Sequence, residues 1–513
     1  MKTPGHWFNL SRPWHVVFGG TLPVLALVAP NVDELSLAGT LWPLVVGTAV
    51  VFLGWVAFAW MVGDGRAAAL SITVLAIATL SYPNVTGVAE AIGLDPAWLY
   101  LIIVVVCFGL LHATRLASEL TVFVNVLLSI VAIAFAVQIA WSELRRSTVV
   151  APPLQAEGSR AASRPDVYVL ILDGYGRSDV LRDAYGFDND LEARLEQRGF
   201  FIADGAHSNY AQTTQSLASS LNFDYLASLF EGIPEGARSR RSLADLINHN
   251  RMFAMLGTAG YRIASYDSEY DLIAPSGSRG LHPWFHVTHF GFSYYEGTAL
   301  PTLFDVFGFP PSELLLRAHR RNVRWLLDHL EAGLESSDAS PTLVFAHLLV
   351  PHPPFVFNAD GTDRHTNLAS AIWDGDHWQT AAAGRGERYA AGYVDSVRYL
   401  NHRLVTFVDR VLNSRRPSIV LIHGDHGPGS RLQWEDPEAT DMRERFGILL
   451  AVRFPDTSYG SLYPDLTPVN ATRAVLNRAI GTSLPRVTDQ SFFATWSRPF
   501  ELIEVTDRLR AMR

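Results

Sequence analysis

The sequence predicts an N-terminal bundle of about five transmembrane helices, followed by an α/β domain with a mostly parallel sheet sandwiched by helices. Three observations predict this fold class. The 513 residues are 49% hydrophobic and only 18% charged, whereas charged residues make up about 25% of an average soluble domain. The charges are unevenly placed, because residues 1–150 hold six of the 41 Lys and Arg residues and seven of the 50 Asp and Glu residues. Beyond residue 165, short apolar runs alternate with stretches of helical periodicity.

Five apolar runs fill the N-terminal part of the chain. They lie at 14–30, 40–62, 67–82, 98–113 and 120–141. Each approaches the ~17 to 25 residues that a helix needs to cross a bilayer. The third and fourth runs are the shortest, so four spans are the alternative. The first run lacks the cleavage site that would make it a signal peptide. We therefore expect a transmembrane domain over residues 1–147.

The short loops between these runs predict the orientation of the domain, since basic loops tend to stay in the cytoplasm. Loops that would share the side of the N-terminus carry Lys2, Arg12, Arg66 and Arg115, and those on the opposite side carry Asp33, Glu34, Glu90 and Asp95 without any basic residue. Five crossings would place the chain after Trp141 on the outer side of the cytoplasmic (inner) membrane. Arg145 and Arg146, just beyond the last run, favour the opposite orientation.

Residues 148–165 are rich in Pro, Ala, Ser and Gly and predict a linker, which leaves residues 166–513 as a second, globular domain. The only cysteine, Cys107, excludes an intrachain disulfide and a zinc site built from several cysteines. A net charge of −9 without a basic run argues against nucleic acid as a partner.

Four apolar runs of strand length follow the linker, at 167–172, 342–347, 418–423 and 447–452. They alternate with longer stretches of helical period, for example around 240–256 and 390–411. Strands that are apolar on both faces and separated by helices form parallel sheets that are covered on both sides.

Polar residues follow three of these strands at the point where each strand ends. They are Asp173 after the first, His347 and His352 at the end of the second and beyond it, and Asp425 and His426 after the third. Ligands of open parallel sheets bind beyond the carboxyl ends of the strands. Carboxylates and imidazoles at one edge favour a divalent metal ion. The simpler alternative is that each residue only caps a helix or completes a turn.

A hydroxyl-rich segment at 208–223 supplies a candidate nucleophile. Thr213, Thr214 and Ser216 lie where a helix is expected to begin, and free N–H groups at a helix start favour an anion. A metal-bound threonine there could attack phosphorus, although some of these hydroxyls would serve only as helix caps.

The order of these motifs resembles the alkaline phosphatase and sulfatase superfamily. The motifs are Leu-Asp-Gly at 172–174, Thr-x-x-Ser from 213, His-x-x-x-x-His-x-Pro from 347 and Asp-His-Gly at 425–427. The membrane-anchored bacterial branch is the most similar, with lipoteichoic acid synthases and lipid A phosphoethanolamine transferases, in which five spans precede an extracytoplasmic catalytic domain. The resemblance implies an alkaline-phosphatase-like fold.

Carried over by position, the metal ligands of that superfamily fall on Asp173, Thr213, Asp425 and His426. The resemblance makes Thr213 the nucleophile as well, because Ser216 matches the serine that follows it by three residues. His347 and His352 resemble the pair that binds the donor headgroup or protonates the leaving group. Two features depart from the phosphoethanolamine transferases: Pro428-Gly429-Ser430 follows the Asp-His-Gly motif, and no histidine lies about a dozen residues beyond His426.

These observations predict a transferase that uses one divalent ion, Mn²⁺ or Zn²⁺. It would move a phosphoglycerol or phosphoethanolamine group from a phospholipid donor in the membrane to a glycan or glycolipid acceptor of the cell envelope, through a phospho-threonine on Thr213. A hydrolase of the same superfamily is the first alternative, and a catalytically silent partner in glycopolymer assembly or export is the second. Sulfatase activity is disfavoured, because the formylglycine that it needs is made from Cys or Ser, whereas Thr213 occupies the position of the nucleophile here.

Overall fold

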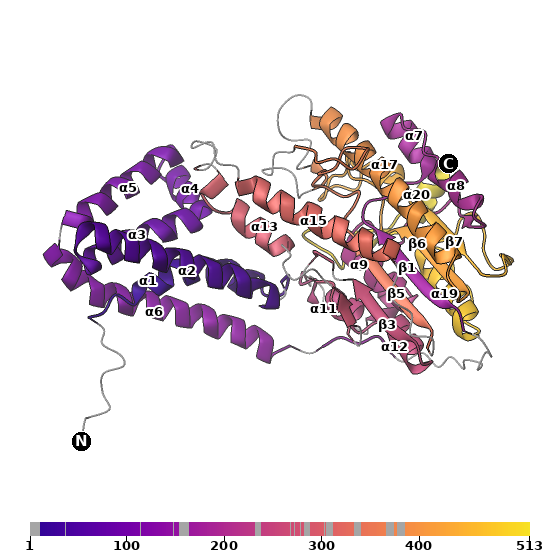
Figure 1. Ribbon diagram of the computed structural model, residues 1–513, viewed down its shortest axis with the longest axis horizontal. Helices are drawn as coiled ribbons and strands as arrows, with labels where there is room; N and C mark the ends of the chain where they lie inside the picture. The colour runs from indigo at the N-terminus through magenta and orange to yellow at the C-terminus, as the bar shows by residue number, and fades with distance from the viewer. Residues whose placement is uncertain are drawn as a thin grey trace, which may run out of the picture. The chain divides into compact units, whose positions relative to one another are not determined.

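A computed structural model of the chain divides into two compact units (Figure 1). The helical unit comprises residues 1–147 and 287–315, and the α/β unit comprises residues 148–286 and 316–513. The structure describes residues 11–35, 37–112, 114–146, 148–152, 164–230, 238–266, 268–270, 272–276, 279–281, 288–301, 303, 311–332, 340–365, 374–376 and 385–512.

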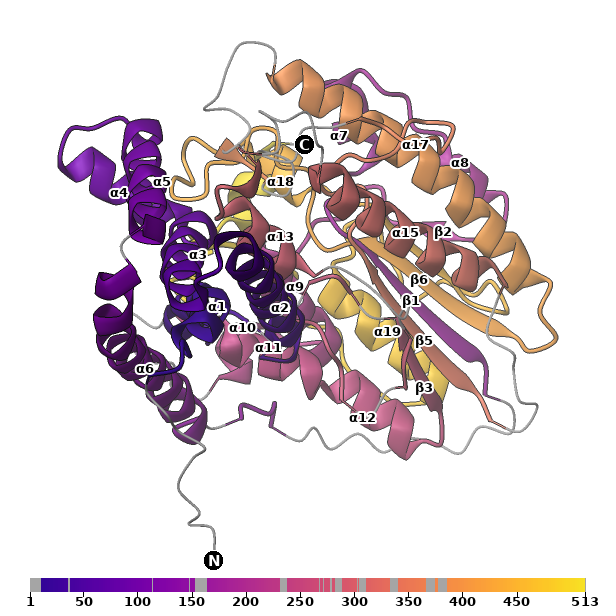
Figure 2. The ribbon, with the colours of Figure 1, turned by 60° about the vertical axis from the view of Figure 1, so that its left-hand side comes forward.

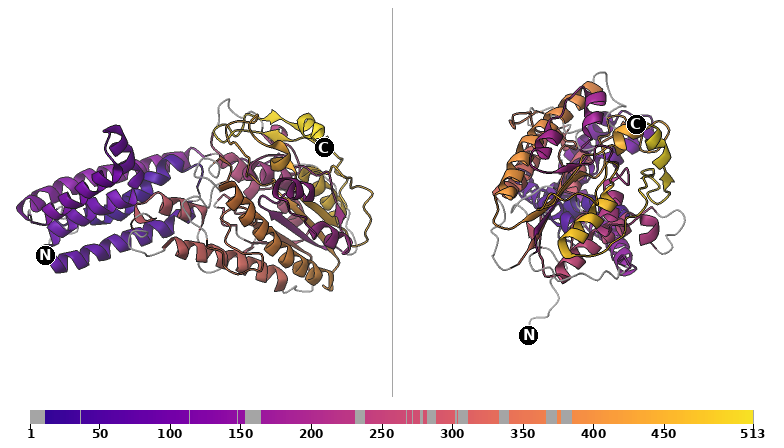
Figure 3. Two further views of the ribbon diagram at one scale, coloured as in Figure 1. Left: turned by 90° about the horizontal axis from the view of Figure 1, so that it is seen from above. Right: turned by 90° about the vertical axis from the view of Figure 1, so that its right-hand side faces the viewer.

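The helical unit contains a helix at each of the five predicted apolar runs. Its helices are α1 (His15–Asn31), α2 (Leu37–Val62), α3 (Gly65–Leu80), α4 (Tyr82–Ala91), α5 (Pro96–His112), α6 (Thr114–Leu144) and α13 (His289–Glu296). Helices α1, α2, α3 and α6 run alongside one another, as the left view of Figure 3 shows. Large apolar side chains such as Trp60 and Leu53 point outward from the bundle, which is expected of a surface that faces lipid.

Among the described residues, two helices are long and apolar enough to cross a membrane: Gly39–Val62 and Glu119–Leu144. A third span is possible if α3 and α4, which meet at an 81° bend, are counted as one. Helix α1 has 17 residues and the apolar part of the fifth helix, Pro96–Cys107, is shorter still. By length and composition the described helices provide two or three spans, and the five predicted spans are not confirmed.

Helix α13 belongs to the helical unit although in the chain it lies between the two segments of the α/β unit. Phe290 packs in a cluster with Val24 and Val28 of α1, which Leu44 and Ile139 flank. The backbone N–H of Ala299, just after α13, donates to the carbonyl of Thr79, at 2.7 Å. The apolar pattern of the sequence does not reveal this return of the chain.

The α/β unit is built on a seven-stranded sheet of order β2-β7-β6-β1-β5-β3-β4. The strands are β1 (Asp166–Leu172), β2 (Phe201–Ile202), β3 (Arg262–Tyr266), β4 (Arg279–Leu281), β5 (Thr342–Leu348), β6 (Ser418–Gly424) and β7 (Leu450–Arg453), and β8 (Phe492–Phe493) and β9 (Ile503–Glu504) form a separate pair. Strands β6, β1, β5, β3 and β4 pair in parallel. Strand β7 pairs antiparallel with β6 on one side and with β2 on the other. The predicted α/β domain is thus confirmed, with an antiparallel edge on a mostly parallel sheet.

Helices cover both faces of this sheet (Figure 2). They are α7 (Ser178–Tyr185), α8 (Leu191–Glu196), α9 (Thr213–Asn222), α10 (Leu226–Leu229), α11 (Arg241–Asn248), α12 (Arg251–Thr258), α15 (Pro311–Ala332), α17 (Arg385–Leu412), α18 (Met442–Phe446), α19 (Pro468–Ile480) and α20 (Thr506–Ala511). On one face, Val167, Val169 and Ile171 share the main core with α9, α12 and α19. On the other, Tyr168 stacks edge-on against Phe407 of α17.

The helix expected around 240–256 is two helices, α11 and α12. Asn250 separates them, because its side chain accepts a hydrogen bond from the backbone N–H of Phe253, at 2.8 Å, and so caps the second helix. The run at 447–452 becomes a strand only from Leu450, since Gly447 and Ile448 form isolated bridges to His207 and Gly176.

Candidate active site

The parallel pairing of β5, β1 and β6 brings the predicted polar residues together. Ile171 of β1 lies opposite His347 of β5 on one side and His423 of β6 on the other. The next residues along β1 and β6 therefore enter the same edge of the sheet, where Asp173, Asp425 and His426 lie with 3%, 0% and 1% of their surface exposed. Gly174 continues from Asp173 with a φ of +75°, a conformation that favours glycine.

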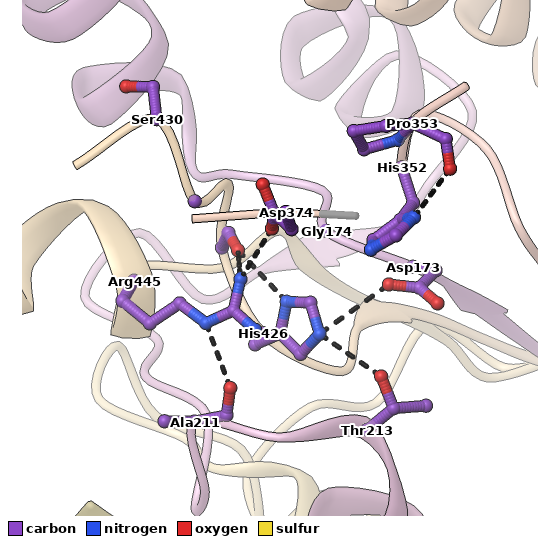
Figure 4. Close-up of polar contacts among 12 residues, drawn as sticks. Asp173, Gly174, Ala211, Thr213, His352, Pro353, Asp374, His426, Ser430 and Arg445 are labelled. Carbon is purple, nitrogen blue, oxygen red and sulfur yellow. Dashed lines mark hydrogen bonds and ion pairs between the residues drawn. The ribbon is translucent and has the colours of Figure 1, made fainter. Parts of the chain in front are cut away.

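Three of the predicted metal ligands form one tight group. Ligand atoms of Asp173, Asp425 and His426 all lie within 4.8 Å of one another. His426 Nε2 is 3.5 Å from Asp173 Oδ1 and 3.3 Å from Asp425 Oδ2. The fourth predicted ligand, Thr213, has its Oγ1 at 3.1 Å from the same Nε2 atom (Figure 4).

Thr213 is the first residue of α9, because Gln212 is extended, with φ −124° and ψ 140°, and the helix begins after it. Ser216 donates a hydrogen bond from Oγ to the backbone carbonyl of Asp425, at 2.8 Å, and so ties α9 to the strand end that carries two of the candidate ligands. Thr214 is buried, with 2% of its surface exposed, whereas Thr213 is partly exposed. Thr213 is therefore the threonine whose hydroxyl reaches the group.

Hydrogen bonds orient the candidate ligands. His426 Nδ1 lies 2.9 Å from the carbonyl oxygen of Gly427. A carbonyl can only accept, so Nδ1 carries the proton and Nε2 offers its lone pair to the site. The backbone N–H of Gly174 donates to Asp425 Oδ1, at 3.1 Å. Gly427 itself has no room for a side chain, because a Cβ atom there would lie 2.0 Å from the carbonyl oxygen of Glu444.

Burial strongly affects the ionisation of this group. Burial raises the pKa of Asp173 to about 8, and Arg445 opposes the rise. Burial also raises the pKa of Asp425 to about 8, with a further contribution from the charge of Asp173. For His426, burial lowers the pKa well below its usual value, and the neighbouring Arg445 adds to the effect. Two buried carboxylates side by side are unfavourable unless a cation lies between them.

A divalent cation fits these residues. Asp173 Oδ1 and Asp425 Oδ2 are buried and have no hydrogen-bond partner among the described residues. Ligand atoms of both carboxylates and of His426 lie close enough together to bind one ion. Such orphaned buried acceptors are costly in the absence of a positive partner. The donor set, carboxylate oxygens with one imidazole and a hydroxyl, is one that Mn²⁺ or Zn²⁺ accepts.

The two other predicted histidines lie at the same edge of the sheet. His347 Nε2 is 3.6 Å from Asp173 Oδ2. His352 lies farther along the chain, and its Nδ1 is 2.7 Å from the carbonyl oxygen of Pro353. Burial, together with smaller contributions from the nearby His352 and His423, lowers the pKa of His347 to about 3. Burial also lowers the pKa of His352, although Asp374 opposes this shift.

Arg445 and Asp374 are site residues that sequence reasoning missed. Arg445 NH1 is 3.0 Å from Asp374 Oδ2, and both side chains are buried. Arg445 also donates from Nε to the carbonyl of Ala211, at 2.8 Å, and from NH1 to that of Gly427, at 3.1 Å (Figure 4). It therefore ties the chain before Thr213 to the chain after His426. Neither residue follows an apolar strand-length run, so the pattern that revealed the ligands could not reveal this pair.

Comparisons with known proteins find one family model and several distantly similar solved structures. A family model described as Sulfatase matches residues 165–459. The C-terminal periplasmic domain of EcEptC from Escherichia coli is 12% identical with a TM-score of 0.42, over 69% of this chain and 97% of that chain. The integral membrane protein lipooligosaccharide phosphoethanolamine transferase A from Neisseria meningitidis is 12% identical with a TM-score of 0.40, over 91% and 95%. Phosphonate monoester hydrolase of Agrobacterium radiobacter is 12% identical with a TM-score of 0.38, over 64% and 80%. No curated protein matches the sequence.

Proposed function

This chain belongs to the sulfatase family, and from that membership we propose that it is a membrane-bound, metal-dependent transferase of phospho-groups. The family lies in a superfamily of enzymes that transfer phosphoryl or sulfuryl groups. Membership of the family does not determine which of the two groups is transferred or which acceptor receives it. The residues of the site favour transfer of a phosphoryl group over a sulfuryl group. Thr213, rather than the Cys or Ser from which a formylglycine is made, occupies the start of α9.

One observation carries this proposal: the hydroxyl of Thr213 lies at a helix start, 3.1 Å from His426 Nε2, beside two buried carboxylates with orphaned oxygens. Asp173, Thr213, Asp425 and His426 would hold the divalent ion, Mn²⁺ or Zn²⁺. When bound, such an ion neutralises phosphoryl oxygens and lowers the pKa of a coordinated hydroxyl. The first N–H groups of α9 would add positive potential for the same oxygens.

The reaction would proceed in two displacements. In the first, Thr213 Oγ bonds to phosphorus as the bond from phosphorus to the glycerol oxygen of the lipid breaks. A histidine, His347 or His352, carries the proton of the threonine hydroxyl to that leaving oxygen. In the second, an acceptor hydroxyl gives its proton to the histidine and attacks phosphorus, and the proton returns to Thr213 Oγ as its bond to phosphorus breaks.

The helical unit suggests where the donor comes from. Apolar helices such as α2 and α6 would keep the catalytic domain at a bilayer, whose lipids carry phosphoglycerol or phosphoethanolamine headgroups. We propose five spans, with the N-terminus in the cytoplasm and the catalytic domain outside the cytoplasmic membrane. The acceptor would be a glycan or glycolipid of the cell envelope. Residues 1–147 would form the membrane domain, 148–165 the linker and 166–513 the catalytic domain.

The intact mass of the full-length protein tests the proposal. The purified protein, loaded with Mn²⁺ in one sample and Zn²⁺ in another, is incubated with vesicles that contain phosphatidylethanolamine and phosphatidylglycerol. We expect a covalent increase in mass equal to the phosphorylated headgroup, located on Thr213 by peptide mapping. Release of the group onto an added glycan rather than onto water separates a transferase from a hydrolase.

Thr213→Ala is the matched variant, because it removes the attacking oxygen and one ligand without changing a core residue. It should form no adduct with either lipid. An adduct that persists in this variant would show that the nucleophile is another group, such as Thr214 or a water molecule. Wild-type protein that binds no divalent ion and forms no adduct would instead favour a catalytically silent partner.

A further inference from the structure

A serine outside every motif described above contacts the candidate active site. Strand β3 pairs in parallel with β5, and Tyr266 lies opposite Ala346 in the register. The chain that leaves β3 therefore passes next to His347, and Ser268 lies on it with 8% of its surface exposed. Ser268 Oγ is 2.9 Å from His347 Nδ1.

The direction of this hydrogen bond depends on the tautomer of His347, and the other contacts of Ser268 and His347 bear on it. The backbone N–H of Tyr270 donates to Ser268 Oγ, at 3.2 Å. A serine hydroxyl has one proton to donate. Among the described residues, His347 Nδ1 is the acceptor that lies within reach of that proton. In a neutral His347 that carries its proton on Nε2, Nδ1 accepts the hydrogen bond and Ser268 is the donor.

The opposite edge of the ring agrees with this tautomer. His347 Nε2 lies 3.6 Å from Asp173 Oδ2 and has no hydrogen-bond partner among the described residues. If Nε2 carries the proton, its N–H group faces the carboxylate of Asp173, which is electrostatically favourable. If Nε2 is unprotonated, its lone pair faces the lone pairs of that carboxylate, which is unfavourable. His347 thus presents an N–H group to the active site.

His352 adopts the opposite tautomer, with its proton on Nδ1. Its Nδ1 lies 2.7 Å from the carbonyl oxygen of Pro353 (Figure 4), so Nδ1 carries the proton and Nε2 keeps a lone pair. His426 is oriented in the same way by Gly427. The two histidines of the His-x-x-x-x-His-x-Pro motif therefore differ: His347 offers a donor, and His352 offers an acceptor.

We propose that Ser268 is a positioning residue that fixes His347 as a neutral hydrogen-bond donor, which stabilises negative charge on the phospho-group, while His352 carries the protons of the reaction. This inference rests on the proposed phospho-transfer and assigns the two histidines different roles in it. A neutral imidazole can act in this way without giving up its proton, since it needs only to polarise an oxygen.

The loop that carries Ser268 is anchored to a helix. The carboxylate of the next residue, Glu269, pairs with His319 and accepts a hydrogen bond from Asn322, both on α15. His319 has 1% and Asn322 6% of its surface exposed. This buried anchor limits the movement of Ser268 Oγ relative to His347, which a positioning residue requires.

Nitrogen NMR of the full-length, histidine-labelled protein tests the tautomer independently of activity. We expect one histidine with an unprotonated, hydrogen-bonded Nδ1 and a protonated Nε2, assigned to His347 because its signals vanish in His347→Gln. In Ser268→Ala, the Nδ1 signal should shift to that of a nitrogen without a donor. A His347 protonated on Nδ1, or bound through Nε2 to a second divalent ion, would overturn the inference.

Kinetics with a phosphodiester donor test the role of the contact. Ser268→Ala should lower kcat about 10- to 100-fold, with a smaller change in KM and an unchanged metal content, and Ser268→Thr should restore most of the activity. Ser265→Ala is the matched control, since Ser265 is a buried serine of β3 whose Oγ has no hydrogen-bond partner among the described residues. It should leave kcat unchanged.

The outcomes separate this inference from the function on which it rests. If the wild-type protein transfers the group and Ser268→Ala is equally active, the role of Ser268 is wrong and the proposed function stands. A wild-type protein with no adduct and no turnover contradicts the proposed function, and NMR still decides the tautomer. Equal losses of kcat in Ser268→Ala and Ser265→Ala would reveal a general packing effect and would also overturn the inference.

Discussion

The hydroxyls of α9 differ in what they contact. Ser216 donates to Asp425 O and Ser219 to Asp224 O, so these hydroxyls stabilise local structure. Ser220 lies 3.5 Å from Leu217 O. Thr213 differs from these serines because its hydroxyl contacts the side chain of an ionisable residue of the site, His426. Of the hydroxyls in α9, that of Thr213 is therefore the candidate nucleophile, and the serine hydroxyls stabilise the helix that positions it.

Replacement of Thr213 by serine should separate the hydroxyl from the methyl group. Thr213→Ser keeps the oxygen but loses the β-branch that restricts χ1. We expect reduced but measurable turnover, an adduct of the same headgroup and the same divalent metal content as the wild type. The measurement is initial-rate transfer from lipid vesicles, with thermal unfolding as a check on the fold. Complete loss of the adduct with normal metal binding would contradict the assignment.

The two buried carboxyl groups predict how pH affects the metal-free protein. Folding raises the pKa of Asp173 and of Asp425 from 3.8 to about 8. Between these values the folded state holds more protons than the unfolded state, so the free energy of unfolding falls as pH rises. The stability that the two protonated carboxyl groups contribute is fully present below about pH 4, and it is lost as the pH rises past about 8. A divalent ion binds the charged carboxylates and removes this loss.

We therefore expect the Tm of the chelator-treated protein to fall from about pH 5 to about pH 8, and the gap to the metal-loaded protein to widen. Differential scanning calorimetry at several pH values measures both. Asp173→Asn, which cannot titrate, should make the metal-free curve flatter. A gap that stays constant across this range would contradict the shared carboxylate site.

At the scale of elements, Arg445 of α18 connects two segments that carry site residues. Arg445→Met would leave Asp374 buried without its cationic partner and would free the carbonyls of Ala211 and Gly427. Loss of one partner of a buried pair costs about 3–5 kcal/mol. We expect a decrease of that size in the free energy of unfolding, measured by denaturant titration, together with weaker metal binding.

Arg498→Met provides the control for this prediction. Arg498 pairs with Glu501 at 3.1 Å, but their side chains are 60% and 51% exposed, and such surface pairs contribute about 0–1 kcal/mol. Arg445→Met combined with Asp374→Leu should recover part of the lost stability, because no charge is then left unpaired. Equal effects of Arg445→Met and Arg498→Met would refute the connecting role of Arg445.

The same elements explain how much of the molecule could be predicted from the sequence. Asp173, Asp425 and His426 were expected at one edge because parallel strands end together, a rule that needs only strand-length apolar runs. Arg445 lies on a five-residue helix, and Ser268 follows the short, mixed strand Arg262–Tyr266. Neither has a local pattern, since only three-dimensional packing brings it to the site. The assignment of Asp173, Thr213, Asp425 and His426 as metal ligands stays a prediction.

At the scale of the whole molecule, the orientation in the membrane is open to a direct test. Arg66 and Arg115, at the starts of α3 and α6, favour a cytoplasmic N-terminus, and five spans would then put residues beyond 150 outside. Protease added to intact spheroplasts should cut this part of the chain, and a cytoplasmic reporter protein should survive as the control. Cleavage only after lysis would show that Arg145 and Arg146 are the correct guides to orientation.

The return of α13 to the helical unit affects the order in which the protein can mature during synthesis. Phe290 and Tyr294 pack beside Val24, Val28 and their neighbours, yet about 140 residues of the α/β unit precede them in the chain. The ribosome must therefore complete β1, α9 and β3 before the helical bundle receives its last helix. Until then, the apolar surface of Val24 and Val28 that Phe290 covers stays open. The helical unit can therefore reach its final packing only after the first segment of the α/β unit, residues 148–286, has been synthesised.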